Sequence, residues 1–277
     1  MIRKTYKRKL FTILEVLIAS SMSAVFGYIV ISSIVNITNL STNLYKESST
    51  QQSARLVLDL ASRSIRNAVP LYGCNDTPAV TSLGACKTLD TLSPNGAPAF
   101  IKATSTEAIF YSYGTRSAGT SGDVPDLVQV TVNPITTNSP PANYNVNDNY
   151  QICVTVYKSA SSNPFTAWRN GSNVPLTLSD VNTISYPTTR PIGADPTGIS
   201  RRCAGPIGHD TTGLIKTLRY RTSSNCYYDT TINSCLNIGD IKQVEVNFLL
   251  SYTTSNKSRL LRPIQAFINI NSANLGG

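Results

Sequence analysis

The sequence is poor in charged residues, has a single histidine and lacks the common catalytic motifs. Asp, Glu, Lys and Arg make up only 14% of the 277 residues. No two of the six cysteines form a Cys-x-x-Cys pair, so we expect no zinc site. There is no Gly-x-Ser-x-Gly elbow and no Gly-rich phosphate loop. We therefore expect no cofactor and no enzymatic activity, although His209 and Asp210 could be recruited to a Ser-His-Asp arrangement.

The cysteines are even in number and widely dispersed, which is typical of disulfides in an oxidising compartment. Six cysteines allow 15 connectivities. Closure of short loops favours two local pairs and leaves the remaining two cysteines as a third. The predicted disulfides are Cys74–Cys86, Cys226–Cys235 and Cys153–Cys203.

The positive charge is concentrated at the N-terminus. The net charge is +9, but the first ten residues supply five positive charges, and without them the balance is +4. Basic residues next to an apolar segment hold that end of a chain in the cytoplasm. The remaining charge is too small to indicate nucleic-acid binding by itself. The five basic residues are Arg3, Lys4, Lys7, Arg8 and Lys9.

Residues 11–35 form an apolar segment in which Glu15 is the only charged residue. A helix of this length spans roughly 37 Å, which is enough for a bilayer core of about 30 Å. We predict a transmembrane helix with a cytoplasmic N-terminus and an exported C-terminal part. A carboxylate in this segment costs about 2.5–3.5 kcal/mol on insertion scales, so Glu15 calls for a partner.

The helical pattern continues beyond the apolar segment. Residues 36–69 contain neither proline nor glycine, and Pro70 ends the run. We predict one continuous helix over residues 11–68. Its second half has an apolar stripe for packing on the exported domain and a charged row on another face. The stripe is Ala54, Val57, Leu58, Ala61, Ile65 and Ala68, and the row is Arg55, Asp59 and Arg63.

Residues 69–277 are predicted to form an exported β-rich domain. Alternating apolar and polar residues indicate an antiparallel sheet with one face buried against the helix, so the fold class is α+β. Segments 114–126, 133–149 and 159–213 are expected to be surface loops. Loop oxygens offer only weak grounds for a calcium site, at Asp123, Asp126, Asn147, Asp148 and Asn149. The predicted strands are Ala108–Tyr113, Leu127–Val132, Gln151–Tyr157, Leu214–Arg221, Gln243–Ser251 and Pro263–Ile270.

The N-terminal pattern resembles the processing and assembly motif of type IV prepilins and type II secretion pseudopilins. The motif is a short basic leader followed by Phe11-Thr12-x-x-Glu15-Val16-Leu17-Ile18-Ala19. The resemblance implies that a prepilin peptidase cuts before Phe11 and methylates the new amine. It also implies that Glu15 pairs with the N-terminal amine of a neighbouring subunit. The family has glycine before the cut, whereas this chain has Leu10.

Two further stretches resemble the PilW-type minor pilins, with the J-type secretion pseudopilin next. They are the helix from Gln51 to Ala68 with the following Tyr72-Gly73-Cys74, and the C-terminal pair around Asp240–Val246 and Leu261–Ile268. The family fold is a long N-terminal helix packed on an antiparallel sheet.

The resemblance implies a minor pilin that primes filament assembly from the inner membrane and presents a tip or adhesin-binding domain. Its partners would be other major and minor pilins, the prepilin peptidase, the inner-membrane assembly platform and a tip adhesin. Three alternatives remain open: a type II secretion pseudopilin, a DNA-uptake pilin, and an exported domain on an unprocessed anchor, should Leu10 block the cut. The DNA-uptake alternative would use Arg201, Arg202, Lys216, Arg219 and Arg221.

Overall fold

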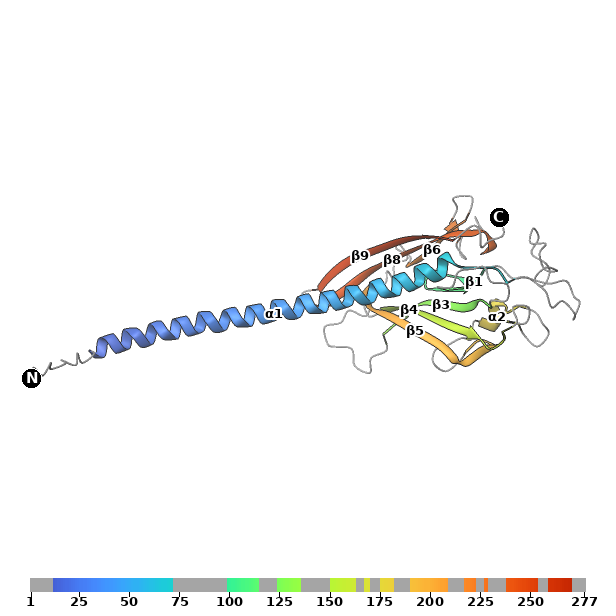
Figure 1. The fold of residues 1–277 in the computed structure, drawn as a ribbon. Helices are drawn as coiled ribbons and strands as arrows, with labels where there is room; N and C mark the ends of the chain where they lie inside the picture. The colour runs from blue at the N-terminus through green and yellow to red at the C-terminus, as the bar shows by residue number, and fades with distance from the viewer. Residues whose placement is uncertain are drawn as a thin grey trace, which may run out of the picture.

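The structure is a computed structural model, and it combines one long helix with a nine-stranded antiparallel sheet. The α+β class predicted from the sequence is confirmed. In Figure 1 the helix extends far from the sheet at its N-terminal end and runs along the sheet at its C-terminal end. The described residues are 12–71, 99–114, 124–135, 150–162, 167–169, 175–181, 190–208, 217–222, 227–228, 238–253 and 259–270.

The long helix, α1, comprises Ile13–Arg66. Thr12 is its N-cap residue, and Asn67 is its C-cap residue, with the Asn67 N–H donating to the Arg63 carbonyl at 3.1 Å. The chain then pairs with the sheet, because Val69 N–H donates to the Tyr111 carbonyl at 3.0 Å. Observed and predicted bounds differ by two residues at each end. At the C-terminal end the reason is this capture of the chain by a strand.

The sheet order is β1-β2-β3-β4-β5-β8-β6-β7, with β9 paired to β8. A short helix, α2 (Leu178–Val181), and a 3-10 turn, η3 (Ile238–Asp240), lie outside the sheet order. The strands are β1 (Phe100–Ala103), β2 (Glu107–Ser112), β3 (Asp126–Pro134), β4 (Tyr150–Ser159), β5 (Ala194–Gly208), β6 (Leu218–Thr222), β7 (Tyr227–Tyr228), β8 (Ile241–Thr253) and β9 (Arg259–Asn269).

The sheet consists of two groups of strands that meet over a short contact. Strands β1 to β5 form one group, and β6 to β9 form the other. Among the described residues, β5 pairs with β8 at Ile207–Leu250 and Gly208–Leu249. Figure 1 shows α1 running between β8 and β9 on one side and β4 and β5 on the other. The helix therefore contributes to holding the two groups together.

The main core lies between α1 and the sheet. Alternate residues of the strands face the helix, as the period-two pattern predicts. In α1 only the stripe near its C-terminal end is buried, with Ile65 and Ala54 at 0% exposure. The sheet residues packed on this stripe include Phe110, Val128, Val154, Val246 and Ile268.

A second apolar cluster covers the opposite face of β2, β3 and β4. It is built around the fully buried Trp168, whose indole N–H donates to the Pro125 carbonyl at 2.6 Å. Ile109, Tyr111 and Leu127 contribute from the strands. The prediction that only one face of the sheet is buried is therefore wrong for these strands. In β2 the apolar run Ala108–Tyr111 is continuous because both faces of the strand are covered.

The six predicted strands correspond to β2, β3, β4, β6, β8 and β9, with shifted ends. Strands β1, β5 and β7 were not predicted. Of these, β5 contradicts the expectation of a surface loop over residues 159–213, since it pairs with β4 from Ala194 to Ile207. Its glycines and prolines suggested a loop. However, a Cβ on Gly205 would lie 2.9 Å from the Tyr150 carbonyl oxygen, so glycine there permits close approach of the strands.

Candidate functional site

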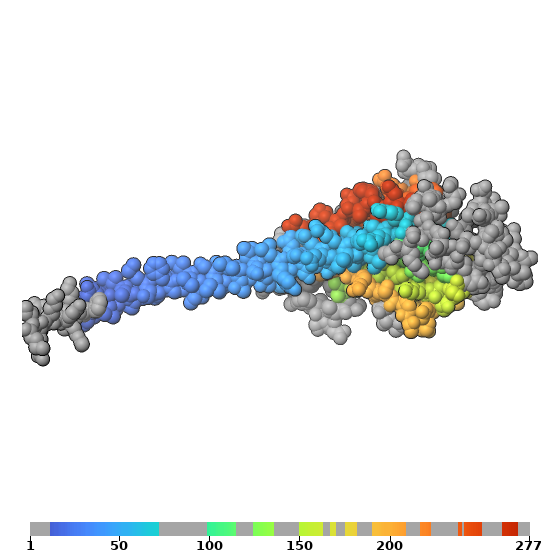
Figure 2. Space-filling model, in the orientation of Figure 1, coloured from blue at the N-terminus to red at the C-terminus, as the bar shows by residue number. Residues whose placement is uncertain are grey.

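The strongest candidate site is the N-terminal half of α1. From Ile13 to Tyr45 the helix carries one charged side chain, Glu15. Its large apolar residues are exposed, for example Phe26 at 63% and Ile37 at 66%. The helix is long and apolar enough to cross a membrane by length and composition. Figure 2 shows this half as a narrow rod extending from the sheet. Such a surface is compatible with a membrane or with an apolar partner.

Thr12 and Glu15 form a capping box at the start of α1. The Thr12 N–H donates to Glu15 Oε2 at 2.9 Å, and the Glu15 N–H donates to Thr12 Oγ1 at 3.3 Å. Two N–H groups that have no partner within the helix are thereby satisfied. The pattern Thr-x-x-Glu in the sequence is the signal that predicts this role, whereas the charge of Glu15 alone predicts only a need for a partner.

The capping box leaves the charge of Glu15 uncompensated by any opposite side-chain charge in the described part of the chain. Hydrogen bonds and the positive end of the helix dipole stabilise a carboxylate at this place. They do not replace an ion-pair partner in an apolar medium. The predicted processing residues Leu10 and Phe11 lie outside the described residues.

The structure joins Cys153 of β4 to Cys203 of β5, which is the pair left after the two local pairs were assigned. These residues are direct partners in the strand ladder, and their Cα atoms are 4.1 Å apart. Cys153 is fully buried, whereas Cys203 is exposed. The other four cysteines, Cys74, Cys86, Cys226 and Cys235, lie outside the described residues.

The arginines proposed for nucleic-acid contact have separate surroundings. Arg201 Nη2 donates to Cys153 Sγ at 3.3 Å, and Arg202 follows on the opposite face of β5. Arg219 Nη1 lies 4.0 Å from Oε2 of the buried Glu245. Arg221 lies over the Phe267 ring at 6.0 Å. Lys216 is outside the described residues, and the described arginines give no support to a single phosphate-binding surface.

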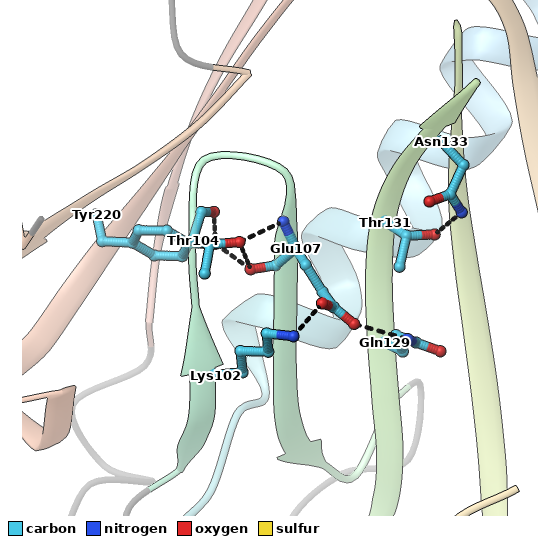
Figure 3. A network of polar contacts seen from close by, with 7 residues as sticks. All are labelled: Lys102, Thr104, Glu107, Gln129, Thr131, Asn133 and Tyr220. Atoms are coloured by element: carbon cyan, nitrogen blue, oxygen red, sulfur yellow. Dashed lines mark hydrogen bonds and ion pairs between the residues drawn. The ribbon is translucent and has the colours of Figure 1, made fainter. Parts of the chain in front are cut away.

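A polar network joins the β1–β2 turn to β3 and β6 (Figure 3). Glu107 forms an ion pair with Lys102 and accepts from Gln129 Nε2 at 2.8 Å. The Tyr220 hydroxyl donates to the carbonyls of Thr104 and Glu107 at 2.9 and 3.2 Å. These groups satisfy one another, so the network holds the hairpin turn to its neighbouring strands. It was not found from the sequence, because its members are far apart along the chain.

A second polar group lies beside the Trp168 cluster. The Tyr111 hydroxyl is buried, and no hydrogen-bond partner for it is found among the described residues. Burial raises the pKa of Tyr111, an effect only partly offset by Arg169. Burial also lowers the pKa of Arg169. Hydrogen bonds from Thr177, which begins the turn before α2, lower the pKa of Asp180.

In the charged row on α1, one of the predicted ion pairs is present. Arg63 Nη2 and Asp59 Oδ2 are 2.8 Å apart on the exposed face. A further ion pair links the helix to the sheet, with Arg262 Nη2 of β9 lying 2.7 Å from Glu47 Oε1. This contact could not be predicted from the sequence, because no local pattern pairs residues so far apart along the chain.

The weaker candidates receive little support. Asp126 begins β3 and is buried. The other candidates, Asp123, Asn147, Asp148, Asn149, His209 and Asp210, lie outside the described residues. Among the described residues no group of three or more His, Cys, Asp or Glu side chains is arranged to hold a metal ion.

Comparison with known protein families, with curated proteins and with solved structures gives no match. The features that indicate a function are the geometry of α1 and the motif at its start.

Proposed function

We propose that the protein is a minor subunit of a type IV pilus-like filament, anchored by α1 in the inner membrane before assembly. The observation that carries the proposal is the contrast along α1. Its first half is exposed and apolar with one carboxylate, whereas its second half buries Ala54, Val57, Ala61 and Ile65 against the sheet. The first half is thus available for a membrane and then for the helices of neighbouring subunits.

In this proposal Glu15 is the assembly residue. A carboxylate in an apolar environment is tolerated when an opposite charge meets it. The amine of a processed Phe11 on a neighbouring subunit would supply that charge, and Thr12 would keep the carboxylate at the start of the helix. Other major and minor pilins, the prepilin peptidase and the inner-membrane assembly platform are the proposed partners, and the β-rich domain would face a tip adhesin.

The first prediction separates the charge of Glu15 from its capping role. Glutamine at the third helical position supports a capping box as glutamate does, whereas valine does not. We expect wild type, Glu15→Gln and Glu15→Val all to reach the membrane fraction. We expect both variants to fall at least about tenfold in sheared filaments, since losing one partner of a buried ion pair costs about 3–5 kcal/mol. The measurement is immunoblotting of membranes and filaments from a bacterium with the cognate assembly system.

Two outcomes would contradict the assembly role. Normal incorporation of Glu15→Gln together with loss of Glu15→Val would assign Glu15 to capping alone. Normal incorporation of both variants would remove Glu15 from assembly altogether.

A second candidate function follows from Leu10. Leu10 is bulky where the family has glycine, and a chain in which it blocks the cut would stay in the membrane as an anchor for the β-rich domain. In that case no amine forms at Phe11, and Glu15 has only its capping role.

A further inference from the structure

The two residues of the Cys153–Cys203 disulfide differ in exposure. Cys153 is fully buried in β4, whereas Cys203 is exposed in β5. In thiol–disulfide exchange a thiolate attacks one sulfur, and the other leaves as a thiolate. Access from solvent therefore directs an external thiol to Cys203 and makes Cys153 the leaving group.

Arg201 stands beside the leaving sulfur, with Nη2 donating to Cys153 Sγ at 3.3 Å. A guanidinium remains positively charged at any physiological pH. Burial raises the pKa of a cysteine thiol, whereas a neighbouring positive charge lowers it, and a thiol of lower pKa leaves faster. The charge of Arg201 therefore counters the effect of burial on Cys153. Access to Cys203 and the charge at Cys153 thus favour the same direction of attack.

We propose that Cys153–Cys203 is a thiol–disulfide exchange site that accepts an external thiol at Cys203 while Arg201 stabilises the departing Cys153 thiolate. The bond between the two cysteine sulfurs breaks, and its electron pair stays on Cys153 Sγ. A new bond forms between the attacking sulfur and Cys203 Sγ. One thiolate and one disulfide are consumed and one of each is formed, so no further oxidant is needed. The proposal is independent of the pilin assignment.

The test uses the full chain in detergent, with reduced glutathione as the external thiol. The reaction is quenched with acid, free thiols are alkylated, and peptides are identified by mass spectrometry. We expect glutathione on Cys203 and the alkyl label on Cys153. Glutathione found mainly on Cys153, or on both cysteines equally, would overturn the proposal. So would a disulfide that reacts only under denaturing conditions.

The role of Arg201 is tested with a matched control on the next residue of β5. We expect Arg201→Gln to slow formation of the Cys203 adduct about two- to fivefold, because the leaving thiol loses its neighbouring charge. Arg202→Gln removes the same charge from the opposite face and should leave the rate unchanged. Arg201→Lys should retain part of the rate. Equal rates for the two glutamine variants would exclude Arg201 from the step. If Arg201→Gln does not fold, the proposal is tested by two other results. These are the rate of adduct formation in Arg201→Lys and the cysteine that carries glutathione in the wild type.

Discussion

Tyr111 and Tyr220 are fully buried tyrosines in the same sheet, but their hydroxyls have different surroundings. The Tyr220 hydroxyl donates to two carbonyls at the β1–β2 turn, whereas no partner for the Tyr111 hydroxyl is found in the part of the chain that the structure describes. A buried polar group without a partner costs free energy, while a buried hydrogen bond contributes about 0.5–1.5 kcal/mol. The contribution of a tyrosine hydroxyl to stability therefore depends on contacts that cannot be read from residue type.

The second prediction compares these two hydroxyls. Tyr220→Phe should lower the free energy of unfolding by about 1–2 kcal/mol, because two carbonyls lose their donor. Tyr111→Phe should be neutral or stabilising, because it removes a polar group that is already unpaired. Denaturant unfolding of the full chain in detergent measures both, and a larger loss in Tyr111→Phe than in Tyr220→Phe would contradict the assignment.

Alkaline pH provides a control on the Tyr111 environment. In the unfolded chain the Tyr111 phenol ionises at about pH 10. Burial raises the pKa of Tyr111, so in the folded chain the phenol stays neutral to higher pH. This contribution to stability is complete below that pH and is lost as the pH rises above it. The loss should be smaller in Tyr111→Phe.

At the scale of elements, α1 and β5 show what the sequence predicts and what it does not. The helix was predictable because a long apolar segment continues into an apolar stripe at helical spacing, and because residues 36–69 contain neither proline nor glycine. The strand β5 was not, because Gly198, Gly205 and Pro206 are typical of loops. Its pairing depends on β4, from a distant part of the chain, and long-range pairing leaves little local signal. The capping role of Glu15 was visible in the local pattern, whereas the contact between Arg201 and Cys153 required the strand register.

The third prediction tests the two faces of α1. Ile65 is completely buried in the main core, whereas Leu56 is 71% exposed on the same helix. Ile65→Ala should destabilise the fold by about 2–5 kcal/mol, since it removes buried methyl groups and leaves a cavity. Leu56→Ala should change stability by less than about 0.5 kcal/mol. Thermal unfolding of both variants measures the difference. Equal losses of stability would contradict the assignment of Ile65 to the packed face of α1.

At the scale of the whole molecule, the chain consists of an apolar rod and a sheet domain, and the two parts have different solvents under the proposed function. The rod would lie in the membrane or among other helices, and the domain would lie in an oxidising compartment. This division is the reason that the N-terminal motif and the six cysteines were enough to predict a membrane anchor and an exported domain. The surface that a partner would recognise could not be predicted, because it depends on how the strands bring distant side chains together.

The fourth prediction concerns the state of the cysteines. If the domain is exported, all six should be paired, as the joined Cys153 and Cys203 are in this structure. Intact mass after alkylation, with and without reductant, counts free thiols in the purified chain. Free thiols on most of the six would refute both the pairing and the membrane orientation.

The fifth prediction concerns the residue before Phe11. We expect at least partial cleavage between Leu10 and Phe11, since Glu15 retains an assembly role only if a free amine forms there. Leucine is bulky where the family has glycine, so Leu10→Gly should increase the processed fraction. The intact mass of protein from membranes of a host with the cognate peptidase is the measurement. A chain that uniformly begins at Met1 in both forms would support the anchor function instead.

The long exposed part of α1 also makes the helix a lever. About 40 residues separate Thr12 from Ala54, where full burial begins, and at about 1.5 Å per residue this is an arm of roughly 60 Å. A rotation of only about 5° at the packed end displaces the tip by roughly 5 Å, nearly the pitch of one helical turn. The position of Glu15 is therefore determined at the sheet end of α1, by the packing of Ala54 and Ile65 and by the Glu47–Arg262 ion pair. A small change in the angle of α1 on the sheet thus becomes a large displacement of Glu15, which under the proposed function must meet a charge on a neighbouring subunit.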